Sequence, residues 1–384
     1  MKIPNYIKSL NLYKPGKPIE ETKREFGLTE VIKLASNENP LGPSPVVLKA
    51  ISEHLSEQHL YPDPSQFELL TQAEEFFGHA KQNIAFGNGT DEIIDFLVRI
   101  FCEKGDAVLT ADYAFQAYEV SAMANQALCL KAPVTADWKF DLQALIQYYE
   151  LHKAKVRIIF LANPNNPTGT FLPPEDLISF LDYFKNNEDV LIVSDEAYVE
   201  FARDKNYRSL SSEILNYKNL VVLRTFSKIF GMAGLRLGAM LAPAEVIDAY
   251  NRMRKPFNVS AVAQTAGIAA MKDADFIRQT QEVTWSGIDF FYKELAAMGI
   301  PFIPSQGNFV LFETPVPGQV VFSEMLKLGI ILRPVDNYGL PNHLRMSVGL
   351  ESENKKAIQC LKKVFEKIKS STLNKTINEN VRDL

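Results

Sequence analysis

Short runs of consecutive apolar residues recur through the middle of the chain and predict buried strands. Six runs stand out: "AVLT" (107–110), "QALCLKA" (126–132), "VRIIFLA" (156–162), "DVLIVSD" (189–195), "NLVVLRT" (219–225) and "LGAMLA" (237–242). Apolar residues fill successive rather than alternate positions, which is typical of strands covered on both faces in a parallel sheet. The amphipathic stretches 90–101, before the first run, and 173–184, between the third and fourth, open with helix start signals, a threonine or prolines followed by acids. The pattern predicts an α/β domain with a mainly parallel sheet wrapped by helices.

The pattern changes from about residue 283 onward. A long helix containing "FFYKELAAMG" precedes the hairpin-like runs "NFVLFE" and "GIILRPV", then "HLRMSVG" and a closing helix near 352–369. This order predicts a smaller α+β domain. The first 40 residues, rich in Pro, Asn and Lys, are expected to form an extended arm and a loop. We therefore expect a large α/β domain over 41–282, with 1–40 and 283–384 forming the arm and the small domain.

Composition is ordinary for a globular enzyme. The 384 residues are 46% apolar and 23% charged, and the net charge is −5, which argues against nucleic acid or an anionic membrane as partner. The cysteines at 102, 129 and 360 are too scattered for a disulfide framework or a zinc site, so a reducing cytoplasm is expected. The opening "MKIPNYIKSLN" lacks the apolar region of a secretory signal, and no apolar run reaches the roughly 20 residues that span a bilayer.

Polar motifs follow the predicted strands at the end where open parallel sheets bind ligands. "NPNNPTG" (163–169), "DEAY" (195–198) and "RTFSKIFGMAGLRLG" (224–238) each come directly after an apolar run. "AFGNGTDEI" (85–93) places a glycine-rich turn before a helix start, and "YAFQAY" (113–118) follows another strand. Each motif alone could be a turn or part of the core. Together they indicate one ligand.

Lys228 directs the choice of that ligand, because burying an unpaired ammonium near a strand end is costly. The cost is avoided if its amine is condensed as an imine with the aldehyde of a planar pyridine that carries a phosphate. Asp195 would then face the ring nitrogen and favour its protonated form. Tyr198 and Asn166 would donate to the phenolic oxygen, and Phe115 would stack on the ring.

The phosphate has its own predicted donors. They combine a helix N-terminus with hydroxyls and a guanidinium, and comprise Gly89, Thr90, Thr225, Ser227 and Arg236. Asp91, which follows Thr90, is also predicted to belong to the cofactor-binding residues. The motif "GNGTDE" lacks the third glycine of a dinucleotide fingerprint, which disfavours a Rossmann site. The cofactor that accounts for all of these residues is pyridoxal 5'-phosphate.

The motifs "NPNNPTG", "SDEAY" and "SK…GLRLG", in this order, resemble those of the fold-type I, class I and II aminotransferases. The resemblance covers nearly the whole chain. It implies a large domain with a seven-stranded, mostly parallel sheet, a small domain built from both termini, and an obligate homodimer.

Further segments resemble the histidinol-phosphate aminotransferase branch of that family: "LYKPGKP" (12–18), "KLASNENPLGPSP" (33–45), "YPDPSQFELL" (61–70) and "LRMSVG" (344–349). The resemblance implies that Tyr61 reaches the phosphate of the neighbouring subunit's cofactor. It also implies a substrate-binding set of Tyr13, Asn37, Tyr61, Asn166, Arg333 and Arg345. "DYAF" stands where the family often has Pro-Thr before the stacking aromatic, so Phe115 is assigned by spacing.

The resemblance implies a ping-pong reaction between histidinol phosphate and 2-oxoglutarate, in which Lys228 also acts as the general base and Asp195 and Tyr198 complete the catalytic group. Arg333 and Arg345 would bind the carboxylates of glutamate in one half-reaction and the phosphate in the other. Three alternatives stay open. An aromatic aminotransferase would use the same cofactor site, and a threonine-phosphate decarboxylase has a related scaffold. A non-enzymatic regulator would carry an N-terminal helix-turn-helix domain, for which the stretch before the first matching motif is too short.

Overall fold

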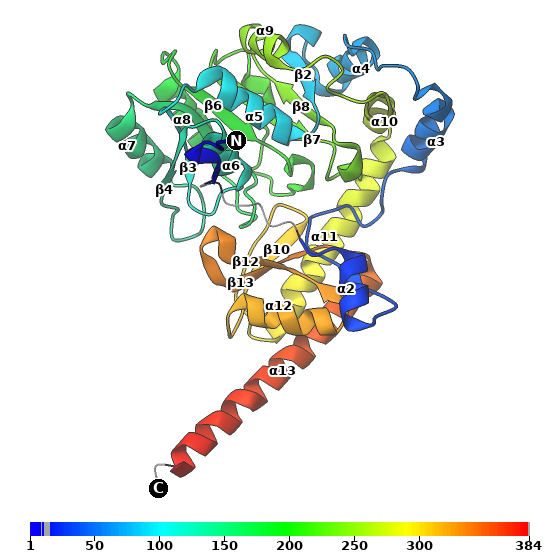
Figure 1. The fold of residues 1–384 in the computed structure, drawn as a ribbon, viewed down its shortest axis with the longest axis vertical. Coiled ribbons are helices and arrows are strands. Elements are labelled where there is room, and N and C mark those ends of the chain that lie inside the picture. The colour runs from blue at the N-terminus through cyan, green and yellow to red at the C-terminus, as the bar shows by residue number, and fades with distance from the viewer. Residues whose placement is uncertain (9, 11–15, 383–384) are drawn as a thin grey trace. The chain divides into compact units, whose positions relative to one another are not determined.

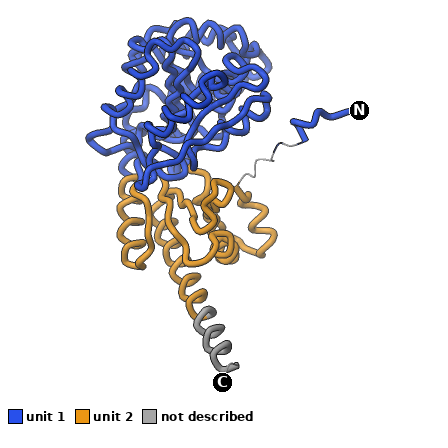
Figure 2. Tube along the Cα trace, turned by 90° about the vertical axis from the view of Figure 1, so that its left-hand side faces the viewer, with its two compact units in different colours: residues 1–14, 38–282, 305–307 blue, residues 15–37, 283–304, 308–384 orange. Residues whose placement is uncertain are grey.

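The computed structural model describes residues 1–8, 10 and 16–382, and side chains as far as residue 370. The chain divides into two compact units, drawn blue and orange in Figure 2. Unit 1 comprises the described residues of 1–14 together with 38–282 and 305–307. Unit 2 comprises the described residues of 15–37 together with 283–304 and 308–384.

The sheet of unit 1 is mostly parallel. In the described part of the chain it has seven strands in the order β2-β8-β7-β6-β5-β3-β4. Their bounds are β2 Ile84–Gly87, β3 Ala107–Ala111, β4 Leu128–Ala132, β5 Val156–Ala162, β6 Leu191–Asp195, β7 Leu220–Thr225 and β8 Gly238–Leu241. Strands β4, β3, β5, β6 and β7 pair in parallel, whereas β8 is antiparallel to both β7 and β2. Residues of the central strands β5, β6 and β7 are nearly all buried, which explains their uninterrupted apolar runs.

Helices surround this sheet (Figure 1). They are α1 Asn5–Lys8, α3 Pro45–His54, α4 Phe67–Phe77, α5 Thr90–Phe101, α6 Ala117–Ala124, α7 Leu142–His152, α8 Pro174–Phe184, α9 Ala244–Met253 and α10 Ala261–Lys272, followed by the start of α11 Ala274–Ala297. Side-chain caps fix the starts of several. Ser44 accepts from the N–H of Val47, and Ser260 accepts from the N–H of Ala263. Such caps satisfy N–H groups that the first turn leaves open.

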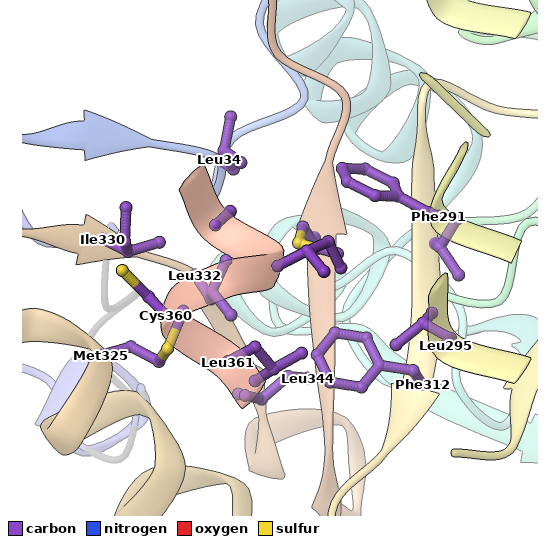
Figure 3. Close-up of a cluster of buried hydrophobic side chains, with 14 of the residues drawn as sticks. Leu34, Phe291, Leu295, Phe312, Met325, Ile330, Leu332, Leu344, Cys360 and Leu361 are labelled. Atoms are coloured by element: carbon purple, nitrogen blue, oxygen red, sulfur yellow. The ribbon is translucent and has the colours of Figure 1, made fainter. Parts of the chain in front are cut away.

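Unit 2 is an α+β structure. Its sheet, counted over the described residues, has four strands in the order β12-β13-β10-β9, and β1 pairs separately with β11. The elements are α2 Ile19–Phe26, β1 Ile32–Lys33, β9 Phe302–Ile303, β10 Phe309–Glu313, α12 Gly318–Lys327, β11 Ile330–Ile331, β12 Arg333–Val335, β13 Leu340–Ser347 and α13 Glu351–Arg382, with the second part of α11. Leu34, Phe291, Phe312, Leu344 and Leu361 belong to its buried core (Figure 3). The N-terminal Leu34 thus shares one core with residues near the C-terminus.

The predicted fold class is confirmed, and all six predicted strands are present. Strand β2 and helix α2 are among the elements that were not predicted. Strand β2 has only four residues and ends in Gly87, so its apolar run is too short to stand out. The extended arm predicted for the first 40 residues is wrong at α2, which has Glu20 and Glu21 in its first turn and Gly27 as a left-handed C-cap. These helix signals were present in the sequence.

No helix in the described part of the chain combines the length and apolar character that crossing a membrane requires.

Candidate active site

Three loops that follow neighbouring strands meet at one edge of the unit 1 sheet. Strands β5, β6 and β7 pair in parallel, with Ala162 opposite Asp195 and Asp195 opposite Leu223. The carboxyl ends of these strands are therefore nearly level. The loops that begin at residues 163, 196 and 226 start side by side at the edge where parallel sheets bind ligands.

Lys228 and Tyr198 face each other within this group. The Nζ atom of Lys228 lies 5.9 Å from the centre of the Tyr198 ring, and the Tyr198 side chain is buried. The positive charge of Lys228 also acts on the Asp195 carboxyl, whose pKa it lowers. An amine, a phenol and a carboxylate thus share one small region of unit 1.

Asp195 is the buried acid of the group, with only 5% of its surface exposed. Burial raises the pKa of its carboxyl to about 6, against an ordinary value of 3.8. The Tyr118 hydroxyl donates to Oδ2 at 2.7 Å and the Ala197 N–H donates to Oδ1 at 3.2 Å, and both bonds oppose that rise. The negative charge of Asp91 raises the pKa slightly further. The carboxylate is ionised at neutral pH and needs a cationic partner.

Tyr118 is a site residue that sequence reasoning missed. The motif "YAFQAY" contains three aromatics, and spacing alone drew attention to Phe115. In the structure the Phe115 and Tyr118 rings meet edge to face at 5.8 Å. Its chemistry could have indicated a role, because a buried tyrosine normally finds a hydrogen-bond partner for its hydroxyl.

The loop that carries Asn166 is tied to the loop that carries Phe115. Asn166 is buried, and cis peptide bonds join Asn163 to Pro164 and Asn166 to Pro167. Asn165 donates to the backbone carbonyl of Tyr113 at 3.1 Å. The predicted shelf and the predicted amide donor therefore belong to two loops joined by a hydrogen bond.

A second group gathers at the N-terminus of α5. Gly89 caps this helix with φ at +79°, and a Cβ there would lie 2.3 Å from Nη2 of Arg236. Arg236 donates to the Ser227 hydroxyl at 3.4 Å and forms an ion pair with Asp91 at 3.1 Å. The structure therefore joins four of the predicted cofactor-binding residues, Gly89, Asp91, Ser227 and Arg236.

Thr90 and Thr225 complete this group through the backbone. A Cβ on Gly238 would lie 2.5 Å from the Thr90 nitrogen, so the glycine lets β8 approach the helix start closely. The N–H of Gly89 donates to the Gly87 carbonyl at 2.8 Å, whereas the first N–H groups of the helix proper have no partner within the helix. Thr225 is buried and accepts from the N–H of Ser227 at 3.2 Å.

A buried ion pair fixes the Tyr198 turn to the strand that leads to Lys228. Arg224 on β7 pairs with Glu200, and both side chains are about seven-eighths buried, at 13% and 12% exposure. Glu196, also buried, accepts from the N–H of Leu210 at 2.7 Å. Removing one member of such a pair leaves an uncompensated buried charge, so the pair holds the turn in place.

Unit 2 brings three of the predicted substrate residues together. Arg333 and Arg345 are directly opposite each other on the antiparallel strands β12 and β13, so their side chains leave the same face of the sheet. Arg345 is buried and donates to the Ala35 carbonyl at 2.7 Å. Asn37 accepts from the Ser347 hydroxyl at 2.8 Å on the same strand β13. Two opposed cations repel each other, and an anion near them would relieve that repulsion.

Tyr61 lies apart from the Lys228 group. Its ring is 83% exposed and stacks on Phe257 at 4.7 Å. Tyr13 lies outside the described residues.

The Lys228 and Arg236 groups together fit pyridoxal phosphate. The missing Cβ of Gly89 leaves a cradle between a helix N-terminus and a guanidinium, which suits a phosphate. The buried Asp195 carboxylate suits a protonated ring nitrogen, and the nearby Lys228 amine suits an aldehyde. No cluster of metal-binding side chains occurs among the described residues.

Comparison with known proteins gives a family match. The model of the family "Aminotransferase class I and II" matches residues 29–361. The histidinol-phosphate aminotransferase of Bdellovibrio bacteriovorus is 52% identical over 96% of this chain and 99% of its own length. That of an Anaeromyxobacter species is 42% identical over 94% of this chain and 99% of its own length.

Comparison with solved structures agrees with this family match. The histidinol-phosphate aminotransferase from Sinorhizobium meliloti in complex with pyridoxal 5'-phosphate matches with a TM-score of 0.87 and 25% identity, over 96% of this chain and 98% of that one. Aspartate aminotransferase from Thermus thermophilus with maleate has the same fold, with a TM-score of 0.81 and 19% identity over 95% of this chain and all of that one. The chain therefore belongs to the class I and II aminotransferase family.

Proposed function

We propose that this protein is a pyridoxal-phosphate-dependent aminotransferase that transfers the amino group of histidinol phosphate to 2-oxoglutarate. The observation that carries the proposal is the convergence, in unit 1, of the Lys228 amine, the buried Asp195 carboxylate and the Arg236 cradle at the N-terminus of α5. The substrate is proposed from the relatives, because two nearly full-length relatives at 52% and 42% identity are histidinol-phosphate aminotransferases.

Each end of the cofactor has a proposed holder. Lys228 would bond its aldehyde carbon, Asp195 would pair with its ring nitrogen, and Arg236 with Ser227 and the start of α5 would hold its phosphate. Tyr198 and Asn166 would donate to its phenolic oxygen, and Phe115 would cover one ring face. When bound, pyridoxal phosphate supplies the electron sink that stabilises negative charge at the substrate carbon.

The chain's own groups then move the protons. The Lys228 Nζ atom would act as the general base and take the proton from the substrate carbon that bears the amino group. Tyr198 restrains this amine, since its ring centre lies 5.9 Å from Nζ. Asp195 stays ionised at neutral pH, because its pKa of about 6 lies below the working range.

Arg333 and Arg345 are the proposed anion-binding residues for the substrates. Their opposed positions on β12 and β13 concentrate two positive charges on one sheet face. A guanidinium fork suits both a carboxylate and a phosphate, so the same pair can accept glutamate in one half-reaction and histidinol phosphate in the other. Asn37 and Tyr13 are proposed to line the same substrate site.

A two-fold homodimer is the proposed assembly. Large apolar side chains are exposed on unit 1 along α3, the segment 55–67 and the end of α9; they include Val46, Leu48, Leu55, Leu60, Tyr61, Phe67, Met253 and Phe257. Large exposed apolar patches mark interaction sites, and these side chains are proposed to form one. Tyr61, exposed and braced by Phe257, would then serve the cofactor site of the second copy. The proposed partners are otherwise small molecules only, and the cytoplasm is the proposed location.

One side-by-side assay tests the substrate. We expect amino transfer to 2-oxoglutarate to have a much higher kcat/KM with histidinol phosphate than with histidinol, phenylalanine or threonine phosphate. Equal or better use of phenylalanine would indicate an aromatic aminotransferase. Release of carbon dioxide from threonine phosphate without an acceptor would indicate the decarboxylase. A protein that binds no pyridoxal phosphate and converts none of the four compounds would contradict the proposal altogether.

A further inference from the structure

The Tyr118 side chain is held rigidly beside Asp195. Its ring is fully buried and lies parallel to the Phe160 ring, with the centres 4.4 Å apart and an angle of 3° between the planes. Phe115 contacts it edge to face at 5.8 Å. Because these two aromatics hold the ring, the hydroxyl oxygen has a fixed position, 2.7 Å from Oδ2 of Asp195.

The two oxygens of Asp195 have different donors. Oδ1 accepts from the backbone N–H of Ala197 at 3.2 Å, a bond that no side-chain substitution removes. Oδ2 accepts from Tyr118 at the shorter distance of 2.7 Å. A phenolic hydroxyl donates one hydrogen bond, and the Asp195 carboxylate receives the one from Tyr118. Of these two hydrogen bonds to the buried carboxylate, the one from Tyr118 is therefore the one that a side-chain substitution can remove.

We propose that Tyr118 is a positioning residue for transamination, which keeps Asp195 ionised and holds its carboxylate in place for the ring nitrogen of the cofactor. The proposal rests on the function proposed above, because only a protonatable ring nitrogen gives Asp195 this task. The geometry carries it: the carboxylate is buried, and a hydroxyl that cannot turn away donates to it. Hydrogen bonds to the charged form of an acid favour that form.

Other charges around Asp195 cannot replace this bond. The groups that act on its carboxyl are Lys228, which favours the charged form, and Asp91, which disfavours it. An imine nitrogen is less basic than an amine, so Lys228 favours the charged form of Asp195 less strongly once it is bonded to the cofactor. The Tyr118 hydroxyl continues to donate its hydrogen bond to Oδ2 of Asp195.

The test compares Tyr118→Phe with a matched control, Tyr217→Phe. Tyr217 is also buried and also donates to an aspartate at 2.8 Å, but that aspartate, Asp182 on α8, is not one of the proposed site residues. The dissociation constant of pyridoxal phosphate is measured on the full-length protein from pH 5 to 9. It is measured again with the analogue in which C–H replaces the ring nitrogen.

We expect Tyr118→Phe to weaken pyridoxal phosphate binding by roughly 10- to 150-fold near neutral pH, the range for a lost hydrogen bond to a charged group. The pH below which affinity falls should move upward, because the acid has lost a donor that favours its charged form. The analogue should bind equally well to the native protein and to the variant. Tyr217→Phe should behave as the native protein in every measurement.

Replacing Tyr118 by 3-fluorotyrosine keeps the ring packing and makes the hydroxyl a stronger donor. The pH at which affinity falls should then move downward, which tests the proposal even if Tyr118→Phe fails to fold. Unchanged pH profiles in both variants, or equal weakening of cofactor and analogue, would overturn the role of Tyr118. A native protein that binds no pyridoxal phosphate would overturn the proposed function itself, which is a separate result.

Discussion

Gly89 and Arg236 approach each other so closely that no side chain fits between them. A Cβ on Gly89 would lie 2.3 Å from Nη2 and 2.9 Å from Cζ of Arg236. The glycine also has φ at +79°, a conformation that other residues rarely adopt. The start of α5 and the guanidinium thus form one surface that a single methyl group would disrupt.

Gly89→Ala should therefore lose affinity for pyridoxal phosphate by at least about tenfold, because Arg236 must move away from Ser227. Gly78→Ala is the matched control: Gly78 has a similar φ of +71° but open space around its missing Cβ. Gly78→Ala carries backbone strain of about 1–2 kcal/mol, and Gly89→Ala carries more, because Gly89 combines its positive φ with ψ at 164°, a region that only glycine adopts readily. Cofactor titration of both checks the prediction, and equal affinities would mean that the cradle does not hold the phosphate.

Asp195→Asn should separate stability from activity. Burial raises the pKa of Asp195 from 3.8 to about 6, so the folded state binds more protons than the unfolded state between these values. Stability contributed by this group is present below pH 3.8 and is lost as the pH rises through about 6, a cost of about 3 kcal/mol. The cofactor-free variant should thus be more stable than the native protein at pH 7–8, yet transfer amino groups poorly.

Urea unfolding at fixed protein concentration, repeated from pH 4 to 8, measures the difference. The excess in the free energy of unfolding of Asp195→Asn over the native protein should shrink as the pH falls through about 6. Asp137→Asn is the contrasting variant, because hydrogen bonds from Lys139 and then Thr135 lower the pKa of Asp137, and its replacement should give no gain. A destabilised Asp195→Asn protein at pH 8 would contradict the account of this buried carboxylate.

The sequence predicted the parts of the site that are local and missed those that need packing. Lys228, Asp195 and Arg236 were found because each follows an apolar strand, so their neighbourhood follows from parallel pairing. The Tyr118 bond joins residues 77 positions apart in the chain and depends on the angle at which α6 meets the sheet. No local pattern encodes that angle.

Complementation tests the proposed dimer. Mixing unfolded Tyr61→Ala and Lys228→Ala chains and refolding them together should restore about a quarter of native activity, because half of the dimers are mixed and each has one complete site. Lys228→Ala mixed with Asp195→Asn is the control. Both of these residues serve the same unit 1 site, so no mixed dimer gains a complete one. Rescue in the control pair, or none in the first, would contradict the crossing of Tyr61.

Arg345→Lys should slow both half-reactions, because lysine keeps the charge but loses the two-pronged donor. The loss of one charged hydrogen bond corresponds to roughly 10- to 150-fold. Single-turnover absorbance with glutamate and with histidinol phosphate measures each half-reaction separately. Arg252→Lys, at an exposed ion pair with Asp248, should change neither rate. An effect confined to glutamate would remove Arg345 from the phosphate-binding role.

The attachment of the cofactor to Lys228 is the central claim, and borohydride reduction followed by peptide mapping tests it most directly. Reduction makes the bond between the lysine nitrogen and the cofactor permanent, and mass spectrometry then locates the pyridoxyl group. The account predicts one labelled peptide, containing Lys228, and no label in a Lys228→Ala protein incubated with pyridoxal phosphate. A pyridoxyl group on any other lysine of the native protein, with Lys228 unlabelled, would contradict it.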